Sequence, residues 1–132
     1  MPSYVSALYI ALSTIFILAL AYRVTVFRRT YKVGIGAGDN QDLDVAIRCH
    51  ANTIENLPLA LLLLLMAELS GLPALTVHAA GSVLLVMRAY YALGMTGTRG
   101  GYSRGRFIGT LGTWTVMLVL SGFIIFQFIA AQ

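Results

Sequence analysis

Long apolar stretches alternate with short polar segments along this chain. Residues 2–22 and 107–132 contain no charged side chain, and at about 1.5 Å per residue either stretch is long enough to cross a bilayer core of about 30 Å as a helix. The charge-free run at residues 56–67 has only 12 residues, which is too short to cross alone. The helix that contains this run is therefore expected to begin in polar sequence.

The pattern predicts four membrane-spanning helices, at about residues 3–27, 43–69, 73–95 and 107–130. The second and third of these need polar turns at one end to reach a crossing length. Glycine-rich segments at residues 34–38 and 97–101, together with the turn at residues 70–73, mark the connections. We therefore predict an all-α membrane protein, a single domain built as a four-helix up-down bundle.

The composition indicates that lipid surrounds most of this chain. Apolar residues make up 58% of it and charged residues 11%, whereas a soluble domain carries about 25% charged residues. The net charge of +4 would suit nucleic acid, but the basic residues adjoin apolar spans and no nucleic-acid motif accompanies them. A single cysteine excludes an intrachain disulfide, and no His or Cys spacing indicates a metal site.

The basic residues also predict the orientation in the membrane. All nine Lys and Arg residues lie in the first connection, the third connection or the adjoining helix ends, and the second connection has none. The positive-inside rule then places the first and third connections in the cytoplasm and both termini on the opposite side. The short, loop-poor chain favours a bacterial inner membrane over the endoplasmic reticulum.

Polar side chains in the second span share one face of the predicted helix. At about 100° per residue, Arg48, Asn52 and Glu55 lie within roughly 60° of one another. Exposure of such groups to lipid costs several kcal/mol each, so the face is expected to point into protein or a hydrated cavity. Arg88 lies at the same depth on the third span, and two converging arginines indicate an anionic ligand. The alternative is structural, with these residues holding the bundle or an oligomer together.

The remaining polar residues carry weaker signals. His50 lies on a different face from this stripe and is placed to contact another helix or subunit. Glu68 lies at the opposite membrane surface, where we expect its side chain to reach water. Three tyrosines near the basic segments suit either an aromatic belt or a hydroxyl that donates to a ligand: Tyr90, Tyr91 and Tyr102.

One segment, residues 48–58, reads RCHANTIENLP and resembles the signature of the MAPEG family, the membrane-associated proteins in eicosanoid and glutathione metabolism. That family includes the microsomal glutathione transferases, leukotriene C synthase and microsomal prostaglandin E synthase. The resemblance continues at residues 28–33, 88–94 and 106–110. It implies a homotrimer of four-helix protomers, with glutathione bound as co-substrate between neighbouring subunits near the cytoplasmic side.

The resemblance also implies roles for individual side chains. Those matching glutathione-binding positions are Arg28, Arg48, Asn52, Glu55 and Tyr91. His50 matches a histidine found in several members, and Arg88 is the further glutathione ligand that its depth in the membrane indicates. Arginines suit the two carboxylates of glutathione, and a glutamate suits its amino group.

Arg106 matches the arginine that stabilises the glutathione thiolate, and it is the implied catalytic residue. A nearby guanidinium favours ionisation of a thiol whose ordinary pKa is about 8.5. Glycines in the preceding loop leave the alternative that Arg104 takes this role. Met95 stands where eicosanoid-making members carry a tyrosine, so eicosanoid synthesis is not expected.

These inferences together predict a membrane-bound glutathione-dependent transferase or peroxidase that activates the glutathione thiolate against a lipophilic electrophile from the bilayer. The alternative is a non-catalytic membrane protein that binds a lipid or an anionic metabolite in the same cleft. The expected partners are two further copies of the chain, glutathione, a lipophilic small molecule and membrane lipid, with neither nucleic acid nor a metal.

Overall fold

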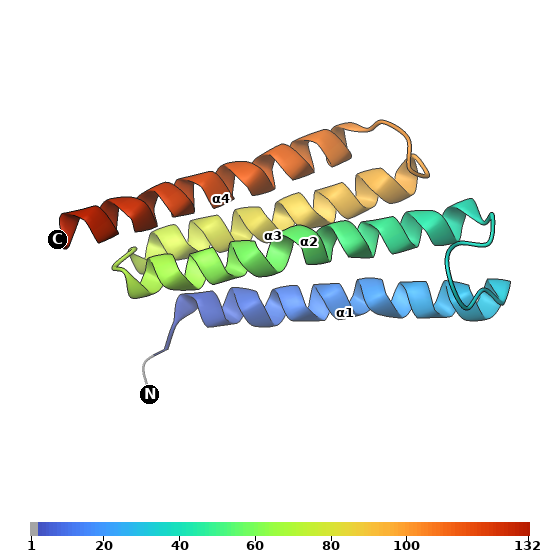
Figure 1. Ribbon diagram of the computed structural model, residues 1–132, viewed down its shortest axis with the longest axis horizontal. Helices are drawn as coiled ribbons and strands as arrows, with labels where there is room; N and C mark the ends of the chain where they lie inside the picture. The colour runs from blue at the N-terminus through green and yellow to red at the C-terminus, as the bar shows by residue number, and fades with distance from the viewer. Residues whose placement is uncertain (1–2) are drawn as a thin grey trace.

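The computed structural model describes residues 3–132, which form four helices and no strand. The helices in chain order are α1 (Val5–Tyr31), α2 (Gln41–Leu69), α3 (Ala74–Gly97) and α4 (Arg104–Ala130). Successive helices run in opposite directions along the long axis (Figure 1). The predicted all-α, up-down four-helix bundle is therefore confirmed.

Three of the four described helices, α1, α2 and α4, have the length and hydropathy needed to cross a membrane. Helix α3 has 24 residues, and His78 and Arg88 lower its hydropathy. The side chains of both residues are hydrogen-bonded to neighbouring helices. This helix can therefore lie at membrane depth without presenting unsatisfied polar groups from these two residues to lipid.

The bundle is arranged with α2 and α3 in its centre and with α1 and α4 along opposite sides (Figure 1). Over the described residues, α1 packs against α2 and α3 but does not touch α4. The closest helix pair is α3 with α4. Helix α4 meets α2 less closely than it meets α3, which leaves room for a groove between α2 and α4.

Glycines on α4 explain its close approach to α3. A methyl group added at Gly105 would lie 2.6 Å from the carbonyl oxygen of Tyr90, and one added at Gly109 would lie 2.7 Å from that of Met87. The spacing from Gly105 to Gly109 is the small-xxx-small pattern that lets two membrane helices come into backbone contact. These two glycines therefore determine where the first turns of α4 lie against α3.

Side chains cap the beginnings of two helices, α2 and α4. The Asn40 side chain accepts a hydrogen bond from the backbone N–H of Leu43 at 2.9 Å, and Ser103 accepts one from the backbone N–H of Arg106 at 3.1 Å. Such caps satisfy donors that the helix itself leaves free. The second cap therefore anchors the turn of α4 that carries Arg106.

Glu68, which the sequence placed at the opposite membrane surface, is half-buried and has partners that the sequence did not predict. Its carboxylate accepts hydrogen bonds from the backbone N–H groups of Val5 at 2.7 Å and Ser6 at 2.9 Å, and from the Ser6 hydroxyl. A carboxylate at the positive end of a helix dipole is stabilising. Glu68 therefore caps α1 and ties its beginning to the end of α2.

A second polar contact joins α1 to α3 in the same half of the bundle. The Tyr9 hydroxyl lies 2.8 Å from Nδ1 of His78 and 3.1 Å from the Ser82 hydroxyl. The two aromatic rings meet edge to face. His78, whose sequence context is apolar, therefore has a structural partner on another helix.

Candidate functional site

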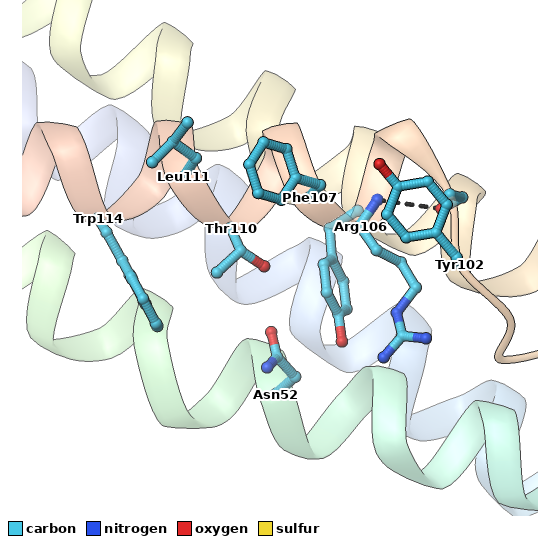
Figure 2. Close-up of a pocket in the computed structure, with 9 residues that line it drawn as sticks. Asn52, Tyr102, Arg106, Phe107, Thr110, Leu111 and Trp114 are labelled. Atoms are coloured by element: carbon cyan, nitrogen blue, oxygen red, sulfur yellow. Dashed lines mark hydrogen bonds between the residues drawn. The ribbon is translucent and has the colours of Figure 1, made fainter.

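A groove of about 560 Å³ opens between α2 and α4 near the end of the bundle that carries the first and third connections. Its volume falls in the range of about 300–1,000 Å³ that is usual for small-molecule sites. The side chains that line it are Asn52, Tyr91, Tyr102, Ser103, Arg106, Phe107, Thr110, Leu111 and Trp114. Figure 2 shows Arg106, Thr110 and Trp114 extending from α4 toward the helix that carries Asn52.

Three of the predicted glutathione residues meet in this groove. Asn52 comes from α2, Tyr91 from α3 and Arg106 from α4. They are distant in sequence, and the antiparallel arrangement of the helices brings them to one level. Arg104, the alternative thiolate partner, is exposed and does not line the groove.

Arg106 stands at the mouth of the groove. Its Nη1 donates hydrogen bonds to the carbonyl oxygens of Gly100 at 2.6 Å and Gly101 at 3.0 Å, so the side chain also holds the third connection in place. Residue 106 lies in the first turn of α4, where the helix dipole adds partial positive charge. The guanidinium and the helix terminus together make this end of the groove favourable for an anion.

Arg88 does not reach the groove. Its side chain is fully buried, and its guanidinium lies 4.9 Å from the centre of the Tyr91 ring. It donates hydrogen bonds to the Thr113 hydroxyl at 3.0 Å, to Oδ1 of Asn52 at 2.8 Å and to the Gly109 carbonyl at 3.0 Å. This arginine therefore joins α2, α3 and α4 beneath the groove.

The rest of the predicted polar stripe lies outside this groove. Arg48 and Glu55 are exposed, and His50 is half-buried. Among the described residues, no hydrogen bond or ion pair is formed by these three side chains. The face that carries Arg48 and Glu55 is therefore not covered by its own chain.

Arg28 lies in the last turn of α1. Its Nη1 donates hydrogen bonds to the carbonyl oxygens of Val33 at 3.3 Å and Gly36 at 2.8 Å. Gly36 has a φ of +68°, a conformation that glycine adopts without strain. Because α1 and α4 make no contact over the described residues, Arg28 and Arg106 of one chain do not meet.

Sequence reasoning missed the α4 residues that follow Arg106 in the groove. Thr110 and Trp114 lie four and eight residues after it, so the helical repeat places all three on one face. This spacing was the signal that would have found them. The indole N–H of Trp114 donates to Oδ1 of Asn56 at 3.0 Å, which holds the ring against α2.

A second, apolar groove of about 410 Å³ adjoins the groove that contains Arg106, and Trp114 lines both. The groove that contains Arg106 is called the polar groove below. Its lining consists of apolar side chains and one serine along the same faces of α2 and α4: Leu59, Leu63, Trp114, Met117, Leu118 and Ser121. An anionic group suits the Arg106 end of the polar groove, which Phe107 and Leu111 also line, whereas a wholly apolar molecule suits its neighbour. The two grooves thus offer adjacent sites, of which only the polar groove carries a charged side chain.

Comparisons with known proteins show the family of the chain. The model of the MAPEG family matches residues 6–126. The chain is also similar to the inner membrane protein YecN of Escherichia coli strain K12 and of Escherichia coli O6:H1 strain CFT073, with 34% identity over 116 residues to each. The matched region covers 88% of this chain and 86% of each relative.

Proposed function

This chain belongs to the MAPEG family of membrane proteins, and on that premise we propose that it is a glutathione-dependent transferase or peroxidase. The observation that carries this proposal is the polar groove with Arg106 at its mouth, next to an apolar groove at Trp114. Glutathione, a charged tripeptide, occupies the first groove. A lipophilic electrophile reaches the second from the bilayer.

Arg106 is the catalytic residue in this proposal. A guanidinium at the start of α4 stabilises a thiolate more than a thiol, which raises the fraction of glutathione that is nucleophilic at neutral pH. In conjugation, the thiolate sulfur bonds to an electrophilic carbon while the leaving group departs with its bonding pair. In peroxide reduction, two glutathione molecules are oxidised to a disulfide while a hydroperoxide is reduced to an alcohol and water.

A homotrimer completes the site in this proposal. Arg48 and Glu55 are exposed on one protomer, and charged groups at this depth are costly to leave in lipid. A neighbouring subunit that covers this face turns it into part of a cleft. Arg28 and His50, which lie outside the groove of their own chain, bind glutathione at the same subunit boundary.

We place the protein in a bacterial inner membrane, as the name of the relative YecN supports. The basic first and third connections face the cytoplasm. The groove, which lies near those connections, then opens toward the cytoplasmic surface.

Isothermal titration of glutathione into detergent-purified protein tests this function, with thiolate absorbance recorded on the same samples. We expect saturable binding to the wild type, loss of binding in Arg48→Ala, and loss of the thiolate signal in Arg106→Ala. Arg104→Ala is the matched control, because Arg104 is exposed and outside the groove. Folded wild-type protein that does not bind glutathione would refute the proposal.

Two further measurements separate the alternatives. Size-exclusion chromatography of Arg48→Ala is expected to show an intact oligomer, whereas dissociation would indicate that Arg48 has a structural role. Turnover is assayed with an activated aryl halide and with an organic hydroperoxide. Glutathione binding without turnover of either would favour a protein that binds a lipid or an anionic metabolite but catalyses nothing.

A further inference from the structure

Arg88 was predicted to bind glutathione directly, but its surroundings indicate a different role. The side chain is fully buried and lines neither groove. Its Nε, Nη1 and Nη2 each donate a hydrogen bond to a protein oxygen. Because the side chain is buried beneath the residues that line the groove, a ligand in the groove is not expected to touch Arg88.

The contact with Asn52 determines which end of that amide faces the groove. Oδ1 of Asn52 accepts a hydrogen bond from Nη1 of Arg88 at 2.8 Å. A guanidinium has donors only, so turning the amide over would set N–H groups against N–H groups. Nδ2 of Asn52 has no hydrogen-bond partner among the described residues, and Asn52 lies in the groove wall opposite Thr110 (Figure 2).

Arg88 is itself held in one position. The Thr113 hydroxyl accepts from Arg88 and donates to the Gly109 carbonyl at 2.8 Å, and that carbonyl also accepts from Arg88. The guanidinium lies against the Tyr91 ring. Since a buried cation is costly unless its hydrogen bonds are satisfied, these contacts hold Arg88 firmly and, through it, the Asn52 amide.

We propose that Arg88 is a positioning residue of the glutathione site, which acts through Asn52. It orients the amide so that the NH₂ group of Asn52 donates to an oxygen of glutathione, either a carboxylate or a peptide carbonyl. This inference rests on the proposed glutathione function. It replaces the direct contact between Arg88 and the ligand that the sequence predicted.

Asn52→Asp tests which atom Asn52 presents. The substitution keeps the shape, and the new carboxylate pairs with Arg88, so the protein is expected to fold. The groove loses a donor, and we expect the Kd for glutathione to rise at least about tenfold. Asn56→Asp, one turn away on α2, adds the same charge but retains an acceptor for Trp114, and its Kd is expected to change less than about threefold.

The result that would overturn this proposal is an Asn52→Asp protein that binds glutathione as tightly as the wild type, or more tightly. In that case Asn52 would use its oxygen toward the ligand. A wild-type protein that does not bind glutathione would instead refute the proposed function together with this inference. The two failures are therefore distinguishable in one titration series.

A double-mutant cycle then tests whether Arg88 acts through Asn52. We expect Arg88→Met to weaken glutathione binding, and we expect no further loss when it is added to Asn52→Ala. If the double variant instead raises the Kd for glutathione by the product of the two separate effects, Arg88 acts independently of Asn52 and the proposal is overturned. If Arg88→Met does not fold, Arg88→Lys takes its place in the cycle. Lysine keeps the positive charge but cannot reproduce the three hydrogen bonds that the Arg88 guanidinium donates to Thr113, Asn52 and Gly109.

Discussion

The contact between α3 and α4 at Gly109 allows a prediction of stability. In Gly109→Ala, the new methyl carbon would lie 2.7 Å from the Met87 carbonyl oxygen and 2.8 Å from Cβ of Tyr91. Most real contacts of a Cβ atom are 3.4 Å or longer. The carbonyl must therefore withdraw by roughly 0.7 Å, and because it belongs to the backbone, α3 and α4 must move apart.

The expected cost can be estimated from the contacts at this position. Overpacking costs about 1–3 kcal/mol. Gly109 also accepts a hydrogen bond from the Arg88 guanidinium, and losing it adds about 1.5–3 kcal/mol. The higher helix propensity of alanine than of glycine offsets about 1 kcal/mol of this loss in stability. We therefore expect the free energy of unfolding to fall by about 1.5–5 kcal/mol.

Reversible unfolding in mixed detergent micelles, followed by circular dichroism, measures this change. Gly122→Ala is the matched control on the same helix, because a methyl group added there meets no atom within 4 Å. Its expected effect lies between zero and a stabilisation of about 1 kcal/mol. Equal unfolding free energies for the two variants would refute the claim that Gly109 sets the distance between α3 and α4.

Two further predictions concern other parts of the bundle. Glu68→Gln removes part of the cap on α1, so we expect a loss of about 1–2 kcal/mol in the free energy of unfolding with an unchanged Kd for glutathione, measured by micelle unfolding and titration. A changed Kd without lost stability would contradict the structural role of Glu68. Trp114 is the only tryptophan of the chain, and saturable quenching of its fluorescence by a nitroaromatic electrophile is expected; unchanged fluorescence under turnover would place that substrate elsewhere.

The four helices follow from the sequence because bilayer thickness and helical rise are general quantities. Apolar runs at residues 2–22 and 107–132 need no tertiary information to be read as helices. The start of α2 in polar sequence was also predictable, since a run of 12 residues is too short to cross. The structure has α2 beginning at Gln41.

The candidate site was predictable only in part. Helical spacing alone placed Arg48, Asn52 and Glu55 on one face, and the resemblance to a family singled out Arg106. The structure brings Asn52, Tyr91 and Arg106 into one groove. Thr110 and Trp114 were missed as site residues because they lie in a charge-free run, where only their spacing of four and eight residues from Arg106 indicates a shared helix face.

By itself, the sequence determined the number of helices, their antiparallel order and the residues that share each helix face, because these depend on local periodicity and on membrane thickness. Tertiary packing decided what each face meets. It buried Arg88 among α2, α3 and α4, left Arg48 on the surface of the chain, and turned Glu68 toward the start of α1. The angle around one helix is a local property, whereas the neighbour that covers a face depends on how all four helices pack together.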